Sequence, residues 1–227
     1  MDKRELMYEG KAKKMFSTEN PGIMLVEYKN SLTAFNAQKK DSIEGKGELN
    51  NRISAWLFTY LAKEGIPNHF IRTIDETHQL VRKVRILPVE VVVRNITTGT
   101  LCKRRGAPEG ITLPRPLVEF YLKNDELGDP LITEDHAELF GWADRKQIDE
   151  IKGIALSIDR ILGKFFDEKS IVLVDFKLEF GIDSEGKLLL SDEISPDTCR
   201  FWDKETKMKL DKDRFRKDLG EIGRAHV

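Results

Sequence analysis

The stretch at 174–181, V-D-F-K-L-E-F-G, alternates apolar and charged side chains. Because successive side chains of a strand point to opposite faces, this pattern predicts a strand with one apolar face and one charged face. The charged face carries Asp175, Lys177 and Glu179, which are an acid, a base and an acid in a row. An antiparallel sheet with one side in water would explain this face, and so would a site that binds a charged ligand.

The residues that follow this strand predict a hairpin. The turn-forming residues at 183–186 should fold 188–193 back against the strand. In one register Lys177 lies opposite Asp192, and Glu179 lies diagonal to Asp192 at about 7 Å, within reach of a shared cation. Mg²⁺ on a nucleotide takes one or two carboxylates, which this pair would supply. A slip of one residue would separate the acids, and the alternative is a surface ion pair of about 0–1 kcal/mol.

Composition and charge are those of an ordinary globular protein. The chain has 227 residues, of which 40% are hydrophobic and 34% charged, with a net charge of −1. That balance argues against a nucleic-acid partner, because proteins of that class carry a basic excess. No apolar run approaches the ~20 residues that cross a bilayer, and the N-terminus shows no apolar signal segment. We therefore expect a cytoplasmic protein with no membrane partner.

Cysteine and histidine spacing predicts neither a disulfide framework nor a zinc site. The two cysteines, Cys102 and Cys199, form no C-x-x-C pair, and the four histidines show no spacing typical of metal ligands. The chain also lacks the G-x-S-x-G elbow of serine hydrolases and the G-x-x-x-x-G-K-[ST] loop of Walker-type nucleotide sites.

Hydrophobic patterning predicts strands first and helices later. Short strands within 6–28, broken by the N-P-G turn at 20–22, predict an antiparallel meander, and two further strands are expected near 79–84 and 89–94. The span 97–130 is rich in glycine and proline and is expected to be irregular.

Two long helices are predicted, and a last helix is expected to begin near Asp211. The first should end at Gly65 and Pro67, and the second should begin at Asp144 as its N-cap and reach about Asp167. The predicted buried stripe of the first helix consists of Leu49, Ile53, Trp56, Leu57, Tyr60 and Leu61.

This order of elements predicts an α+β fold with two lobes. We place the boundary so that 1–85 form a β-rich N-terminal lobe and 86–227 form an α+β C-terminal lobe. A cleft between lobes is a common place for a ligand.

Two further segments could bind anions. The turn Gly10-Lys11-Ala12-Lys13 lies between two predicted strands, where glycine permits a close backbone approach and the lysines supply charge. Lysines that protect an edge hairpin from aggregation are the alternative. Arg94 ends an apolar strand and is followed by hydroxyl groups up to Thr100, a composition that suits a phosphate but also fits an arginine at a strand end.

Polar residues elsewhere are weaker candidates. Arg200 follows the predicted hairpin closely enough to reach its charged face, and Lys103-Arg104-Arg105 is a basic run that could bind an anion. Lys123 and Asp129 lie in the glycine- and proline-rich span, where a polar loop is the simple explanation.

Seven segments of the chain, taken in order, carry a family resemblance. They read G-K-A-K at 10–13, L-P-V-E-V-V-V-R-N at 87–95, L-K-N-D at 122–125, L-V-D-F-K-L-E-F-G at 173–181, D-E-I-S-P-D at 192–197, F-W-D-K-E-T at 201–206 and D-K-D-R-F-R at 211–216. Together they resemble the phosphoribosylaminoimidazole-succinocarboxamide synthase (SAICAR synthetase) family of purine biosynthesis, nearly end to end.

The resemblance implies an activity and an architecture. Members of the family ligate L-aspartate to 5-amino-1-(5-phosphoribosyl)imidazole-4-carboxylate (CAIR) with ATP and Mg²⁺, and release SAICAR, ADP and phosphate. Their two-lobed fold resembles those of ATP-grasp enzymes and protein kinases, with the N-terminal lobe binding ATP and the C-terminal lobe carrying the metal and CAIR sites. Members are commonly homo-oligomers, so a homodimer is expected.

The resemblance also assigns residues to roles. The ATP-binding residues are Gly10, Lys11, Ala12, Lys13, Arg82, Ile86, Glu179 and Asp192, with Mg²⁺ held by Glu179 and Asp192. The CAIR-binding residues are Arg94, Thr100, Arg200 and Arg214, and the residues that position the reacting groups are Lys123, Asp129, Asp175 and Lys177.

Two other functions stay open. One is a small-molecule kinase on the same scaffold, which would release ADP without needing L-aspartate and CAIR together. The other is a non-catalytic nucleotide-binding protein, which is expected to have lost its metal-binding acids. Glu179 and Asp192 are both present, which argues against the second.

Overall fold

The computed structural model describes residues 5–34, 39–211 and 213. The chain divides into two compact units: Met1–Leu87 with Phe180–Ser195, and Pro88–Glu179 with Pro196–Val227. Each lobe expected from the sequence is continuous along the chain, whereas in the structure Phe180–Ser195 returns to the first unit. The predicted last helix lies outside the described residues.

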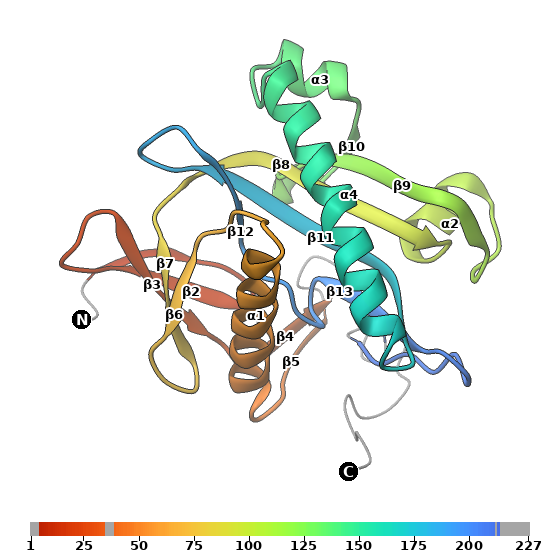
Figure 1. Ribbon diagram of the computed structural model, residues 1–227, viewed down its shortest axis with the longest axis horizontal. Coiled ribbons are helices and arrows are strands. Elements are labelled where there is room, and N and C mark those ends of the chain that lie inside the picture. Colours follow the sequence, from red (N-terminus) through yellow and green to blue (C-terminus); the bar gives the residue numbers. More distant parts are fainter. Residues whose placement is uncertain (1–4, 35–38, 212, 214–227) are drawn as a thin grey trace. The chain divides into compact units, whose positions relative to one another are not determined.

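The first unit is built on a five-stranded antiparallel sheet in the order β1-β2-β3-β7-β6 (Figure 1). Its first three strands form the predicted meander, in which Phe16 pairs with Leu25 and Leu25 with Leu80. The strands are β1 (Leu6–Glu9), β2 (Lys13–Ser17), β3 (Ile23–Tyr28), β6 (Phe70–Thr73) and β7 (His78–Arg82). A separate hairpin consists of β4 (Ser31–Ala34) and β5 (Lys39–Ser42).

Helix α1 (Lys46–Lys63) exists where the sequence predicts it, but the predicted buried face is partly wrong. Trp56 and Leu49 are exposed, by 49% and 56%, whereas Phe58 is fully buried. The helix ends as predicted, because Gly65 adopts the left-handed conformation that terminates a helix without steric cost. The buried face keeps Leu57 and Leu61 of the predicted stripe and also includes polar residues, namely Asn50, Asn51 and Ser54.

The larger sheet has the order β10-β9-β8-β11-β12, with β13 also paired to β11. In this sheet β8 lies between β9 and β11, so residues that are far apart in sequence lie on neighbouring strands. The strands are β8 (Arg85–Ile96), β9 (Thr112–Leu122), β10 (Leu131–Ile132), β11 (Ile171–Ile182), β12 (Leu188–Ser191) and β13 (Cys199–Asp203).

The expectation of an irregular span at 97–130 is wrong. It contains helix α2 (Gly99–Arg105), the long strand β9 and a short 3₁₀ helix, η1 (Asp125–Leu127). The prolines that suggested a loop lie at 114 and 116, in a bulge where 113–116 separate the pairs Arg94–Leu117 and Ile96–Thr112. A bulge leaves backbone N–H groups without ladder partners, so proline costs little there.

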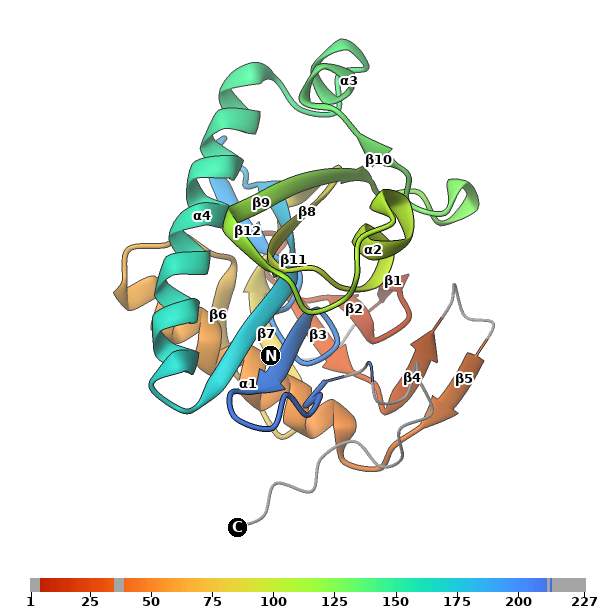
Figure 2. The same cartoon turned by 90° about the vertical axis from the view of Figure 1, so that its right-hand side faces the viewer.

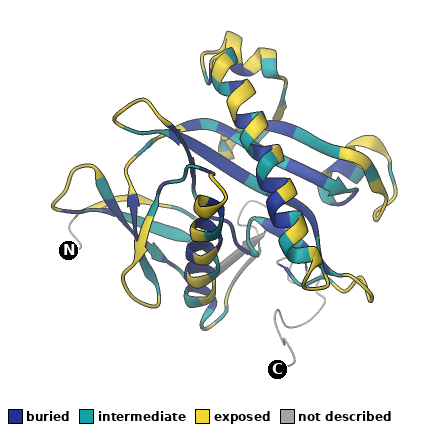
Figure 3. Ribbon diagram, viewed as in Figure 1, coloured by how far each residue is buried: buried dark blue, intermediate teal, exposed yellow. Residues whose placement is uncertain are grey.

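Helix α4 (Arg145–Asp167) matches its prediction, and the short α3 (Glu134–Leu139) precedes it. Asp144 caps α4 in a capping box with Gln147, an arrangement worth about 1 kcal/mol. Figure 3 shows the alternation of buried and exposed residues along α4, as expected for a helix with one apolar stripe.

The charged face of β11, which carries Asp175, Lys177 and Glu179, is largely shielded from water. Asp175 and Glu179 are each only 2% exposed, and Lys177 between them is half-buried. On the other face Phe176, Leu178 and Phe180 are buried as predicted. The α+β prediction is confirmed by these sheets and helices.

Both cysteines, Cys102 and Cys199, are free thiols. Within 5–34, 39–211 and 213, no helix is both long enough and apolar enough to span a bilayer.

Candidate active site

The G-K-A-K segment forms a tight turn between β1 and β2. The Gly10 N–H donates to the Lys13 carbonyl at 2.8 Å, which closes the turn. The Lys13 ammonium bonds the Asp192 carboxylate and lies 3.6 Å from that of Glu193 and 5.8 Å from the centre of the Tyr28 ring. Burial alone would lower the pKa of Lys13, but the two carboxylates outweigh it and raise the pKa above its ordinary value.

Asp192 adopts an uncommon backbone conformation, with φ of 60°. The left-handed region disfavours most side chains, and aspartate and asparagine are the non-glycine residues that enter it most readily. This conformation directly precedes Glu193 and follows β12, so it sets the direction in which both carboxylates leave the strand.

His69 lies buried beside this cluster. Burial, followed by the positive charge of Lys13, lowers the pKa of His69 to about 3, so the ring is neutral. Its ring packs edge-on against Phe58 at 5.1 Å, and its Nε2 has no hydrogen-bond partner among the described residues. The neutral ring therefore closes one side of the cluster without adding a charge.

Two of the residues expected to bind ATP lie in one segment, Arg82 at the end of β7 and Ile86 in β8. The Arg82 N–H donates to the His69 carbonyl at 2.7 Å, and the Ile86 side chain is 38% exposed. Gly181 of β11 packs against this segment, since a Cβ there would lie 2.5 Å from Val84. The segment is thus held in place, with an apolar side chain still accessible.

In the second unit, Glu179 is surrounded by ammonium groups. Lys177 lies 2.6 Å from Glu179 and 2.8 Å from Glu90, and Lys123 also bonds Glu179. Burial raises the pKa of Glu90, and Glu179 and Asp129 act in the same direction against Lys177. Three acids and two lysines thus share one small region.

Asp129 is fixed by the loop that carries it. Its carboxylate accepts the Asn124 N–H at 3.0 Å, and its backbone has a φ of 49°. Sequence reasoning names Lys123, Asp129, Lys177 and Glu179 separately, and the structure joins them with Glu90, which it missed.

Arg94 is buried in a second network. Its Nε donates to Glu119 at 2.7 Å, its Nη1 to Asp175 at 2.6 Å, and its Nη2 to Tyr121 at 3.1 Å and Thr100 at 3.4 Å. The side chain is 4% exposed. Arg94 is therefore held by protein groups on every side of its guanidinium.

Glu119 is the acid that this network adds to the predictions. Burial opposes its ionisation, yet the hydrogen bonds from Arg94 and Tyr121 hold the pKa of Glu119 below its ordinary value. It also accepts a hydrogen bond from Arg104 at 2.6 Å. Glu119 and Tyr121 share a face of β9, so the alternation rule could have found them had 97–130 been taken as a strand.

Arg200 of β13 approaches the same aspartate. Its Nη1 donates to both Asp175 oxygens, at 2.8 and 3.0 Å, and its Nε to Asp213 at 3.0 Å. The structure therefore joins Arg94, Thr100, Asp175 and Arg200 in one network. Arg214 lies outside the described residues.

The two proposed metal ligands stand in different units. Asp192 belongs to the first unit and Glu179 to the second, so their sharing of one ion stays a prediction. Among the described residues, no group of three or more histidine, cysteine, aspartate or glutamate side chains could hold a metal ion by itself.

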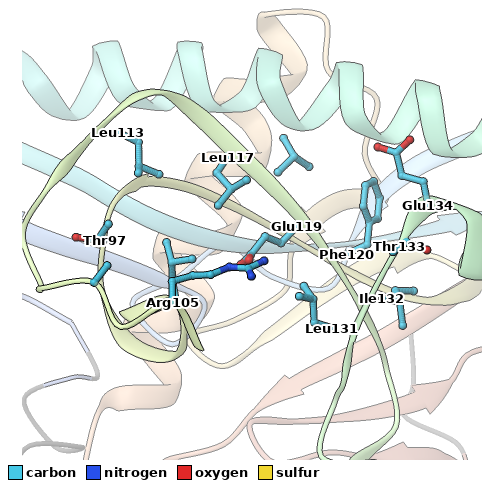
Figure 4. A pocket seen from close by; sticks show the side chains of 13 residues that line it. Thr97, Arg105, Leu113, Leu117, Glu119, Phe120, Leu131, Ile132, Thr133 and Glu134 are labelled. Carbon is cyan, nitrogen blue, oxygen red and sulfur yellow. The ribbon is translucent and has the colours of Figure 1, made fainter. Parts of the chain in front are cut away.

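A separate cavity of about 520 Å³ lies beside β9 (Figure 4). Its walls are mainly apolar, including Leu113, Leu117 and Leu131, and Arg105 points into it. No residue predicted to bind ATP or CAIR lines it, although Glu119 does.

Comparison with known proteins gives consistent results along the whole chain. A sequence model of the SAICAR synthetase family matches residues 6–226. The phosphoribosylaminoimidazole-succinocarboxamide synthase of Lysinibacillus sphaericus (strain C3-41) is 55% identical over 227 residues, which are 100% of this chain and 96% of that protein.

Solved structures agree with the sequence match. The crystal structure of phosphoribosylaminoimidazole-succinocarboxamide synthase from Ehrlichia chaffeensis has a TM-score of 0.94 and 46% identity, and the match covers 96% of this chain and 93% of that one. A SAICAR synthetase solved in complex with ADP has a TM-score of 0.93 and 48% identity, with coverage of 96% and 92%. Because the family model matches nearly the full length of the chain, this chain belongs to the SAICAR synthetase family.

Proposed function

We propose that this chain is an ATP-dependent ligase of de novo purine biosynthesis. It joins the amine of L-aspartate to the carboxylate of CAIR and yields SAICAR, ADP and phosphate. The observation that carries this function is the end-to-end identity of 55% to a phosphoribosylaminoimidazole-succinocarboxamide synthase, which leaves no segment of the chain unmatched.

The charge distribution suits the chemistry. A carboxylate resists attack by an amine because an oxide would have to leave, so the γ-phosphoryl group is first transferred to the CAIR carboxylate. The aspartate amine then attacks this mixed anhydride, and phosphate leaves. Phosphoryl transfer depends on positioning and charge neutralisation more than on a protein nucleophile. Lys11, Lys13 and Lys177 supply positive charge for that purpose.

ATP is assigned to the first unit. The turn Gly10-Lys11-Ala12-Lys13 would cover the phosphates, and the segment with Arg82 and Ile86 would bind adenine. The raised pKa of Lys13 keeps its ammonium charged at any pH at which the enzyme works. The ADP complex of a relative supports nucleotide binding by this fold.

Mg²⁺ fits the acids present, since carboxylate oxygens are the hard donors that this ion prefers. Glu179 and Asp192 would hold it, and both carboxylates already bind cationic partners in the structure. When bound, the ion supplies positive charge to the ATP phosphates. Lys13 and Lys177, the ammonium partners of these acids, would then be available to phosphate oxygens.

CAIR is assigned to the arginine network of the second unit. Arg94, Thr100 and Arg200 would form the subsite for its phosphoribosyl group, with Arg214 as a further candidate. Asp175, Lys177, Lys123 and Asp129 would position the reacting carboxylate and amine. Because Arg94 is enclosed by protein groups, its contribution is to fix Asp175 and Thr100. A cytoplasmic homodimer is part of this proposal.

The test is an ADP-release assay with the purified chain, ATP and Mg²⁺, in which CAIR and L-aspartate are omitted in turn. A ligase releases ADP at full rate only when both are present. Full-rate release with CAIR alone would indicate a kinase instead. ATP binding without turnover under any combination would indicate a non-catalytic nucleotide-binding protein.

A further inference from the structure

Arg104 of α2 is part of a basic run that the proposed function leaves without a role. Its Nη1 donates to the Thr100 hydroxyl at 3.1 Å, and its Nη2 donates to Glu119 at 2.6 Å. Its guanidinium carbon lies 5.5 Å from the centre of the Tyr121 ring. Figure 2 shows α2 beside β9, the strand that supplies both Glu119 and Tyr121. These contacts fix the direction of the Arg104 guanidinium, unlike that of a flexible arginine on the surface.

The two arginines on Thr100 differ in their free donors. A guanidinium has five N–H groups. Arg94 uses its Nε, its Nη1 and both hydrogens of Nη2 on protein acceptors, and its side chain is 4% exposed. Arg104 uses one hydrogen on each of two nitrogens, and its side chain is 27% exposed. Arg104 therefore has N–H donors left for an incoming anion, whereas Arg94 has used four of its five on protein acceptors.

Arg200 approaches the same segment from Gly99. A Cβ at Gly99 would lie 2.8 Å from the Arg200 Nη2, so the guanidinium lies directly against this glycine, and the φ of 56° at Gly99 favours glycine there. The Arg200 Nε and Nη1 bond Asp213 and Asp175, while Nη2 donates to no other side chain in the described part of the chain. Gly99 and Thr100 are thus flanked by three arginines, Arg94, Arg104 and Arg200.

We propose that Arg104 is a further substrate-binding residue, which contacts the phosphate monoester of the ribonucleotide together with Thr100 and Arg200. Glu119 and Tyr121 are its positioning residues. The identity of the substrate rests on the proposed function, whereas the recognition of a phosphate monoester rests on the arginine geometry alone. Arginine suits this group because its fork of N–H donors matches phosphate oxygens.

A matched pair of variants of the full-length chain tests this inference. Arg104→Gln and Arg105→Gln remove the same charge from adjacent positions of one helix, but Arg105 points into the cavity beside β9 and is not bonded to Thr100 or Glu119. The probe is ribose 5-phosphate, with binding measured by calorimetry at fixed ionic strength. Loss of a charge-assisted hydrogen bond should weaken binding about 10- to 100-fold in Arg104→Gln, and Arg105→Gln should stay within about 3-fold of the parent.

The kinetic readout separates a binding role from a structural one. In Arg104→Gln the KM for CAIR should rise while the KM for ATP stays at the parent value. Arg104→Lys keeps a cation near Thr100 without the fork to Glu119, and should recover part of the affinity. If Arg104→Gln fails to fold, Arg104→Lys replaces it in the test. Ribose 5-phosphate binding and a KM for CAIR equal to those of the parent would then show that the forked guanidinium of Arg104 is not needed.

Two results would overturn the inference: equal weakening in both glutamine variants, or parent-like binding in a folded Arg104→Gln. Its failure is distinct from failure of the proposed function. A chain that binds ribose 5-phosphate through Arg104 but never couples CAIR to L-aspartate refutes the ligase and leaves the phosphate subsite standing. A working ligase whose CAIR KM ignores Arg104 refutes only the subsite.

Discussion

At the scale of single residues, the polar clusters place charges where little water reaches them. Glu179 is 2% exposed and its carboxylate bonds the ammonium groups of Lys123 and Lys177, so removal of its charge leaves these two partly exposed cations with one partner fewer. A substitution of Glu179 also removes a proposed metal ligand. Effects on folding and on catalysis must therefore be measured separately at this position.

Glu179→Gln is expected to reduce kcat by about 100-fold or more, because loss of a transition-state charge contact costs roughly 2.7–4 kcal/mol. The Mg²⁺ concentration for half-maximal rate should rise as well. Circular dichroism should still report a folded chain, since the amide keeps the shape of the carboxylate. Turnover near the parent rate would remove Glu179 from the metal role.

His69 gives a prediction about pH. Its pKa is about 3 in the folded chain because of burial and Lys13, against roughly 6.5 when unfolded, so the unfolded state binds the proton first on acidification. Stability due to the neutral ring is present above pH ~6.5 and is lost as pH falls below it, by about 2 kcal/mol between pH 7 and 5.

His69→Gln removes this term, so urea unfolding of the variant should lose about 2 kcal/mol less than the parent over that interval. Each protein is compared with itself at the two pH values, which cancels any constant cost of the substitution. Equal losses of unfolding free energy between pH 7 and 5 in the two proteins would mean that folding does not lower the pKa of His69.

At the scale of elements, α1 shows that apolar spacing alone does not identify a buried face. Trp56 belongs to the stripe predicted from sequence but is 49% exposed, and Phe58 lies outside that stripe but is fully buried. The matched substitutions Phe58→Ala and Trp56→Ala should therefore differ strongly in cost.

Phe58→Ala should lower the free energy of unfolding by about 3–5 kcal/mol, because it leaves a cavity in the core. Trp56→Ala should cost no more than about 1.5 kcal/mol, chiefly through its stacking on Tyr60 at 5.2 Å. Chemical denaturation of both variants measures the difference. A larger loss for Trp56→Ala would mean that the exposed face of α1 is covered in solution.

The same comparison explains which parts of the fold could be predicted from sequence. Helix α4 was predictable because its cap and its apolar stripe are local signals. Strand β9 was not, because Pro114 and Pro116 signal a loop unless the bulge is known. The alternation at 175–179 predicted a charged face, but not its partner Glu90, since the pairing of Lys177 with a residue 87 positions away leaves no local pattern.

At the scale of the whole molecule, the chain passes between its two units three times, at 87/88, 179/180 and 195/196. The returning segment supplies partners that 1–87 cannot provide. Leu190 exchanges backbone hydrogen bonds with Pro67 and His69 at 3.0 Å, and Asp192 binds Lys13. The first unit is therefore incomplete without a segment made much later in synthesis.

A fragment of residues 1–87 is accordingly expected to lack a cooperative thermal transition by circular dichroism. Addition of a peptide with the sequence 180–195 should induce strand signal and a transition whose midpoint depends on peptide concentration. The same peptide with its residues scrambled is the control. A fragment that melts cooperatively without the peptide would contradict the prediction.

The left-handed backbone at Asp192 has a consequence for what natural variation and engineering can do at this position. Glutamate keeps the negative charge but is poorly suited to a φ of 60°, and asparagine suits the φ but gives up the charge. Glycine would relax the chain and supply no ligand at all. A randomised position selected for turnover should therefore return aspartate alone, whereas selection for folding only should admit asparagine and glycine, so the two surveys together would separate what the backbone demands from what the chemistry demands.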